Sequence, residues 1–292
     1  MKKIVYPEIS LNELPRYHQW PGRLLASTPE PVRLKTVEEV QREFNRDKWG
    51  AMLSYAVGDP GFGIHAAECM EMDPETVIPF YDDGKLFLGP FRHVRERHIE
   101  LYSEVLSKYV KHASALVELG AGFGSKIIGL SSKNVFKHLP LYAAELTSSG
   151  RELIDLLATR DGKHINVGAC DFREGSISFK NIPPDAIVFT SFAAHYVPEL
   201  NSMFVKLISD LKPLVVVHFE PCMECMRTDN LHELMCFNYI KRNDYNQNLI
   251  SLLNSESVDG KLRNLSIRPN VMGDNPLLPL SVITWQPRLP GL

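Results

Sequence analysis

The feature that most constrains this chain is a short apolar run that ends in an acid and in three glycines on alternate positions. Residues 115–124 are ALVELGAGFG, and residues 125–132 continue with the apolar spacing of a helix. Without a Cβ atom, Gly120, Gly122 and Gly124 let the backbone turn sharply and let a ligand approach it closely. The run therefore predicts a buried strand, a glycine turn that binds a ligand, and a helix; a tight turn without a ligand is the alternative.

The glycine spacing separates this turn from the dinucleotide-binding turn, in which G-x-G-x-x-G places a pyrophosphate at a helix N-terminus. Here the spacing is G-x-G-x-G, and Glu118 precedes it. The stretch resembles the first motif of class I S-adenosylmethionine-dependent methyltransferases, whose cofactor carries no phosphate. The resemblance implies that S-adenosylmethionine binds at a short set of residues: Glu118, Gly120, Ala121, Gly122 and Gly124. The same spacing disfavours a nicotinamide oxidoreductase.

Two more strand ends carry the residues that a nucleoside requires. Glu145 ends the apolar run 141–144, about 20 residues after the glycines, where an acid holds the ribose hydroxyls. A third run, 164–170, leads directly into Asp171 and Phe172, a polar and apolar pair suited to the amino group and the ring of adenine. We expect Glu145, Asp171 and Phe172 to bind the cofactor.

Fourth and fifth buried strands are predicted at residues 185–190 and 214–221, which are rich in valine and isoleucine and flank a helix at about 198–211. Ser191 and Glu220 lie at the ends of these strands. Alternating strands and helices indicate a doubly wound parallel sheet, in which ligands bind at the carboxyl ends of the strands. Ser191 is thereby a further expected cofactor contact.

The apolar segments 263–273 and 278–287 predict a closing pair of strands. The resemblance then implies a Rossmann-like, doubly wound, mostly parallel seven-stranded α/β sheet with an antiparallel last strand and an N-terminal helical cap. We expect the cap in residues 1–97 and the methyltransferase domain in residues 98–292.

Residues 1–114 lack the pattern of a regular sheet, because prolines and glycines interrupt the early segments. Residues 91–112 predict a strong helix. At its start, Arg92, Arg95 and Arg97 could reach a carboxylate of cofactor or substrate, or could form a solvated cationic face.

Composition limits the remaining possibilities. A chain of 292 residues with 44% hydrophobic content can bury a large core, which favours one domain with a covering segment. We expect no membrane span and no signal peptide, and five scattered cysteines indicate reduced thiols in a cytoplasmic protein. The net charge of −3, without a lysine or arginine block, argues against a nucleic-acid substrate.

Methyl transfer depends mainly on positioning, with a base where the acceptor must lose a proton. His195, just after the fourth strand, and Glu220 are the expected catalytic residues; a packed structural histidine and a helix N-terminal acid are the alternatives. Tyr196, next to His195, would bind the substrate. Tyr239 and Asn243 share one face of a later predicted helix and would also bind the substrate, unless that face is only a partly exposed flank. The fourth strand also lacks the Asn/Asp-Pro-Pro-aromatic motif, which disfavours nucleobase and glutamine amides as acceptors.

A zinc site is the alternative for the segment after Pro221. Cys222, Cys225, His232 and Cys236 supply four suitable ligands, but the connection is too short to fold the first pair back onto the helix that carries the second. We therefore expect free thiols and no metal. The sequence predicts a methyltransferase acting on an oxygen or nitrogen of a small-molecule or peptide-like acceptor. The alternative is a methyltransferase-like protein that binds cofactor or zinc and serves a partner enzyme; the oligomeric state stays open.

Overall fold

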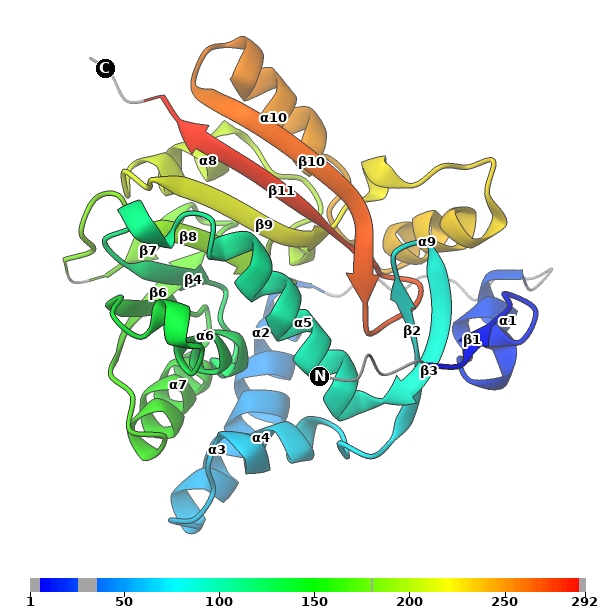
Figure 1. Cartoon of the computed structure of the whole chain (residues 1–292), viewed down its shortest axis with the longest axis horizontal. Coiled ribbons are helices and arrows are strands. Elements are labelled where there is room, and N and C mark those ends of the chain that lie inside the picture. Colours follow the sequence, from blue (N-terminus) through cyan, green and yellow to red (C-terminus); the bar gives the residue numbers. More distant parts are fainter. Residues whose placement is uncertain (1–5, 26–35, 180, 289–292) are drawn as a thin grey trace.

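A single mixed sheet of eleven strands forms the centre of the computed structural model, which describes residues 6–25, 36–179 and 181–288 (Figure 1). The strand order is β1-β3-β2-β10-β11-β9-β8-β4-β5-β6-β7. The strands are β1 (Glu8–Ile9), β2 (Val77–Asp82), β3 (Lys85–Pro90), β4 (Leu116–Leu119), β5 (Leu141–Ala144), β6 (Ile165–Asp171), β7 (Ser176–Ser178), β8 (Ile187–Ser191), β9 (Val215–Pro221), β10 (Leu262–Gly273) and β11 (Leu280–Pro287).

The middle of the sheet is parallel: β4 pairs with β5 and β8, β5 also pairs with β6, and β8 also pairs with β9. The chain passes from β4 to β5 on one side and returns to β8 on the other, so the strand order reverses next to β4. A crevice opens at such a reversal, outside the carboxyl ends of the strands. The glycine turn follows β4 directly and therefore lies in this crevice.

Helices cover both faces of the parallel strands. The α-helices are α1 (Trp20–Leu25), α2 (Val37–Arg42), α3 (Trp49–Gly58), α4 (Ile64–Glu71), α5 (Phe91–Leu106), α6 (Ser125–Ser131), α7 (Ser148–Arg160), α8 (Ser202–Ser209), α9 (Leu231–Arg242) and α10 (Leu249–Val258). A π-helix, η2 (Glu43–Lys48), joins α2 to α3, and the short 3-10 helices are η1 (Leu14–Arg16), η3 (Val110–His112), η4 (Asn134–Phe136), η5 (Ala194–Tyr196) and η6 (Met223–Cys225).

Side chains of each strand alternate between two hydrophobic cores. In β4, Leu116 packs into the core shared with α5, α6 and α7, whereas Val117 and Leu119 pack into the core shared with α8 and α10. Both cores contain fully buried side chains, so the parallel strands are apolar on both faces, as the sequence predicted. The doubly wound α/β arrangement is confirmed.

The closing pair of strands is also confirmed. β11 pairs antiparallel with β9, and β10 pairs antiparallel with β11. The last strand, β11, therefore runs opposite to the parallel strands of the sheet. β10 and β11 form the long orange and red ribbons of Figure 1.

The sheet is wider than the expected seven strands. On one side, β10 pairs with β2 of the β2–β3 hairpin, and β1 pairs with β3 at the edge. On the other side, β7 pairs with β6 and forms the opposite edge. The expectation that residues 1–114 hold no regular sheet was therefore wrong. Single strands such as β2 alternate only briefly, and the hairpin gains its partner from the far end of the chain. The expected domain boundary after residue 97 falls inside α5.

No helix within the described ranges is long and apolar enough to cross a membrane. The helices that precede the parallel strands pack instead against the rest of the protein: α3 contacts α7, and α4 contacts α6. In Figure 1, α3 and α4 lie in blue beside the green helices α6 and α7. They form one wall of the space above the glycine turn.

Candidate cofactor and acceptor site

A cavity of about 1550 Å³ lies at the carboxyl ends of β4, β5, β6 and β8. Seven expected cofactor residues line it: Gly120, Ala121, Gly122, Glu145, Asp171, Phe172 and Ser191. His195 and Tyr196 line it as well. Five expected residues do not line it: Glu118, Gly124, Glu220, Tyr239 and Asn243. The structure thus gathers most of the strand-end residues around one space and excludes a minority.

Left-handed backbone explains why the turn after β4 carries glycines. Gly120, Gly122 and Gly124 have φ angles of +76°, +58° and +85°, a region that other residues rarely adopt. A Cβ atom on Gly120 would overlap the side chain of Ala193, and one on Gly122 would lie 3.2 Å from the Trp49 ring. The glycines therefore turn the chain, and at Gly120 and Gly122 they also avoid contacts that a Cβ atom would make with Ala193 and Trp49.

Glu145 holds the glycine turn from the tip of β5. Gly122 N–H donates to Glu145 Oε2 (3.0 Å), while the N–H and hydroxyl of Thr147 donate to Oε1 (3.0 and 2.8 Å). Burial raises the pKa of Glu145, although these donors oppose the shift. Each carboxylate oxygen has two lone pairs, so Oε2 still has one with which to accept a hydroxyl from a ligand in the cavity.

Glu118 lies beneath the same turn and is fully buried. Ile127 N–H donates to its Oε2 (3.1 Å), and its Oε1 has no partner among the described residues. Burial raises the pKa of Glu118 to about 8, against the opposing charge of Lys126 and the Ile127 N–H. A carboxyl group in this state gains by pairing with a cation.

Asp171 and Phe172 lie at the tip of β6, on the rim of the cavity. Asp171 Oδ1 accepts hydrogen bonds from the N–H groups of Arg173 (2.8 Å) and Glu174 (3.1 Å), which fixes the carboxylate at the strand end. The Phe172 ring contacts Phe204 edge-on, with centroids 5.2 Å apart. The pair offers a polar edge and an apolar surface next to each other, as an adenine ring requires.

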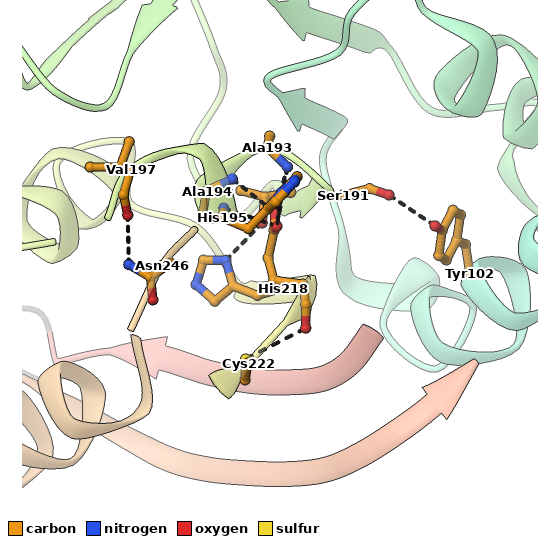
Figure 2. A network of polar contacts seen from close by, with 11 residues as sticks. Tyr102, Ser191, Ala193, Ala194, His195, Val197, His218, Cys222 and Asn246 are labelled. Carbon is orange, nitrogen blue, oxygen red and sulfur yellow. Dashed lines mark hydrogen bonds and ion pairs between the residues drawn. The ribbon is translucent and has the colours of Figure 1, made fainter. Parts of the chain in front are cut away.

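Ser191, the last residue of β8, joins the sheet to α5. Its Oγ lies 2.9 Å from the Tyr102 hydroxyl, and Tyr102 is fully buried (Figure 2). The next residue, Phe192, has a φ angle of +50°, which is strained for a residue with a side chain. The backbone therefore leaves β8 abruptly at the cavity, and such strain is often found at functional sites.

Glu220 lies behind the cavity wall and is fully buried. Its carboxylate accepts hydrogen bonds from the N–H groups of Ala193 (3.0 and 3.1 Å), Ala194 (3.1 Å) and His195 (3.3 Å). Figure 2 shows these backbone groups converging on one point. Burial acts to raise the pKa of Glu220, but His195 and the backbone donors outweigh it, and the net shift is downward. The carboxylate fixes the loop after β8.

A second buried group supports the same wall. Trp285 Nε1–H donates to His218 Nε2 (2.9 Å), so the other ring nitrogen, Nδ1, carries the proton and donates to Thr190 Oγ1 (3.0 Å). Burial lowers the pKa of His218 to about 4, which keeps the ring neutral. These contacts connect β8, β9 and β11 beneath the cavity.

His195 and Tyr196 form the aromatic side of the cavity. His195 is 2% exposed, and its Nδ1 lies 3.4 Å from Glu220 Oε2 without the alignment of a hydrogen bond. Its ring lies against Tyr196 and Tyr245, with centroids 4.1 and 4.7 Å apart. Asn246 holds this loop from outside by donating to Val197 O (2.8 Å), as Figure 2 shows.

Tyr239 and Asn243 lie away from the cavity, in and after α9. The Tyr239 hydroxyl accepts from Asn275 Nδ2 (3.0 Å), and its ring packs edge-on against Trp20. Asn243 caps α9 by donating to Tyr239 O (2.8 Å). The helix face is thus used for packing against α1, and the structure does not bring it to the cavity.

The four residues of the alternative zinc site separate into two groups. Cys222 packs with Trp285 on one face of the sheet, whereas Cys236 belongs to the core beneath the β2–β3 hairpin, 3.7 Å from His232 Nε2. His232 Nε2 is also 2.8 Å from Pro276 O. Within the described part of the chain, no three His, Cys, Asp or Glu side chains gather as a metal would require.

Sequence analysis did not identify several cavity residues. Phe44, in the π-helix η2, and Trp49, the first residue of α3, line the cavity, and no sequence signal marks the π-helix that joins them. His98, Tyr102 and Asp274 also line it. His98 and Tyr102 could have been found, because polar residues interrupt the buried face of α5.

No protein-family profile matches the chain, and no curated protein matches its sequence. Solved structures resemble it. Magnesium protoporphyrin IX methyltransferase from Synechocystis PCC 6803, with bound SAH, aligns at a TM-score of 0.49 and 12% identity, covering 85% of this chain and 98% of that chain. A putative sarcosine dimethylglycine methyltransferase from Galdieria sulphuraria aligns at 0.46 and 11%, covering 67% and 86%.

An O-methyltransferase from Bacillus cereus in complex with SAH aligns at a TM-score of 0.44 and 8% identity, covering 82% of this chain and 91% of that chain. All three structures are methyltransferases, the class whose first motif the glycine turn resembles. At these TM-scores and identities, the likeness by itself assigns no activity or substrate to this chain.

Proposed function

We propose that this protein is an S-adenosylmethionine-dependent methyltransferase. The observation that carries the proposal is the geometry at the switch point of the sheet. A left-handed glycine turn after β4 faces the cavity together with Glu145 at the tip of β5 and Asp171 at the tip of β6. The glycine turn leaves space for a ligand, Glu145 can accept a hydroxyl, and Asp171 can bind a polar group. This combination suits a nucleoside without phosphates.

The proposed cofactor contacts follow from this geometry. Glu145 accepts a ribose hydroxyl through the free lone pair of Oε2, Asp171 binds the adenine amino group, and Phe172 covers the ring. Glu118 does not line the cavity, so it would act on the methionine ammonium group only across the turn, and this nearby cation would lower the raised pKa of Glu118 and favour its charged form. The bound sulfonium supplies an activated methyl group, so the protein's task is to align an acceptor with it.

We further propose that residues 98–292 form the methyltransferase domain and residues 1–97 cover it. The acceptor is an oxygen or nitrogen of a small-molecule or peptide-like compound, and the protein acts in the cytoplasm. His195 contacts the acceptor or the cofactor edge, and Tyr196 contacts the acceptor. For Glu220 we propose a positioning role in place of a catalytic one, because backbone donors occupy its carboxylate.

Calorimetry with S-adenosylhomocysteine and with NADH tests the proposal. We expect the former to bind and the latter not to bind, since the turn lacks the spacing that places a pyrophosphate. Gly122→Val should abolish binding, because its side chain would enter the cavity beside Trp49. Gly162→Val is the matched control: Gly162 has a similar φ of +67° and no neighbouring atom within 4 Å of an added Cβ. Preferential binding of NADH would refute the assignment.

A further inference from the structure

The inner face of α5 carries an unusual row of polar side chains. Arg95, His98 and Tyr102 are spaced three and four residues apart, so they lie on one side of the helix, and all three line the cavity. His98 is 8% exposed and Tyr102 is fully buried. This side of the cavity faces the glycine turn from a different part of the chain.

Two polar atoms in this row have no partner. His98 Nε2 and Arg95 Nη1 are both buried and make no hydrogen bond within the described ranges of the chain. The Tyr102 hydroxyl, by contrast, is paired with Ser191 Oγ at 2.9 Å. Buried polar groups are normally paired, and leaving a charged donor without an acceptor is especially costly. Two such atoms on one helix face beside the cavity are therefore available to a ligand.

The guanidinium of Arg95 is already fixed in orientation. Its Nη2 lies 3.2 Å from Glu68 Oε1 and 3.6 Å from Glu71 Oε2, and its centre lies 5.4 Å from the Phe91 ring centroid. The two glutamates therefore occupy one side of the planar group and leave Nη1 for another acceptor. A held guanidinium is a good donor to a carboxylate, because little freedom is lost on binding.

The charges that act on His98 are mostly positive. Lys126, Arg95 and Arg97 face it with one opposing acid, Asp274, and burial together with the three cations lowers the pKa of His98. Arg97 is neutralised by Asp82 and Glu100. Lys126 also lines the cavity, and no ion pair or hydrogen bond of its side chain occurs within the described residues. Glu68 and Glu71 likewise oppose the charge of Arg95, so a bound anion would find the unpartnered Arg95 Nη1 and the Lys126 ammonium on this face rather than a net positive field.

We propose that the inner face of α5 is a binding site for a carboxylate group of the methyl acceptor, held by Arg95 Nη1, His98 Nε2 and the Lys126 ammonium. The proposal rests on the proposed function, since it takes the glycine turn and the tips of β5 and β6 as the cofactor side. The cavity of about 1550 Å³ exceeds the roughly 300–1000 Å³ of a single small-molecule pocket, which leaves room for both ligands. The acceptor class is thus a carboxylic acid with a hydroxyl or amino group.

The test uses benzoate and succinate as probes on the protein saturated with S-adenosylhomocysteine. We expect at least one probe to bind the wild-type complex by calorimetry, and to bind Arg95→Met and His98→Leu at least about tenfold more weakly. His98→Gln keeps a donor and should recover part of the affinity. The matched control is Arg97→Met, which removes an arginine from the same helix outside the cavity, and its probe affinity should equal that of wild type.

The cofactor has a carboxylate of its own, and the same variants distinguish the two sources. If the site serves the acceptor, S-adenosylhomocysteine should bind Arg95→Met as it binds wild type. The proposal is overturned if Arg95→Met loses affinity for S-adenosylhomocysteine but not for 5′-methylthioadenosine, which lacks the amino-acid end, or if neither probe binds wild type more tightly than Arg95→Met. Failure of wild type to bind S-adenosylhomocysteine at all would instead refute the proposed function.

Discussion

The tips of β5 and β9 make a useful comparison, because each carries a buried glutamate at the carboxyl edge of the same sheet. Glu145 faces the cavity and holds the glycine turn, whereas Glu220 lies behind the wall and holds the loop after β8. Burial acts on both carboxyls in the same direction. The net pKa shift is nevertheless upward for Glu145 and downward for Glu220.

The difference lies in the donors. Glu220 accepts from three consecutive backbone N–H groups and has His195 beside it, so its charge is well compensated. Glu145 accepts from Gly122 and Thr147 and lines the cavity. Strand-end acids that look alike in the sequence can therefore have different roles. Glu145 is available to a ligand, whereas the carboxylate of Glu220 stabilises the loop after β8.

The largest expected effect would come from Glu220→Ala. The substitution leaves three buried N–H groups without an acceptor, and we expect the free energy of unfolding in urea to fall by about 3 kcal/mol or more. Glu220→Gln keeps an acceptor oxygen and should lose less. The exposed Glu199→Ala serves as control and should stay within about 0.5 kcal/mol of wild type. A loss below about 1 kcal/mol for Glu220→Ala would contradict the anchoring role.

A smaller effect, measured on cofactor binding, is expected for Glu145→Ala. Loss of a charged acceptor for a ribose hydroxyl should weaken S-adenosylhomocysteine binding by about 1.5–3 kcal/mol, measured by calorimetry. Glu152→Ala, which removes an exposed acid from α7, is the control and should bind normally. An unchanged dissociation constant in Glu145→Ala would remove this residue from the cofactor site and end the contrast with Glu220.

The smallest expected effect is the change in the free energy of unfolding per pH unit that Glu118 causes. Its pKa in the folded protein, about 8, lies above the ordinary 4.5 of a glutamate, so between these values the folded state holds a proton that the unfolded chain has released. Its contribution to stability should therefore fall as the pH rises through this window, by at most about 1.4 kcal/mol per pH unit. Glu118→Gln should show a flatter stability profile in urea unfolding between about pH 5 and pH 8. Parallel profiles would show that Glu118 stays ionised in the fold.

Local sequence was sufficient to predict the parallel half of the fold. The apolar runs of β4, β8 and β9 are buried on both faces, which requires continuous apolar sequence and makes such strands easy to recognise. The runs of β4, β5 and β6 placed Gly120, Glu145 and Asp171 at the cavity, because the carboxyl ends of parallel strands meet at one edge. The β2–β3 hairpin was missed although its two-residue Asp83-Gly84 turn is a local sequence signal, whereas its pairing with β10 is set by tertiary contact.

What the sequence by itself determined is the glycine turn, because only residues without a Cβ tolerate three left-handed positions beside a ligand space. It also determined the alternation of strands and helices and the closing antiparallel pair. Only the tertiary structure decided which acids face the cavity, since Glu145 and Glu220 both lie near a strand end and differ in the groups packed around them. The Arg95–His98 face is likewise a tertiary feature: partnerless atoms acquire meaning only when burial removes water, and burial depends on the whole fold.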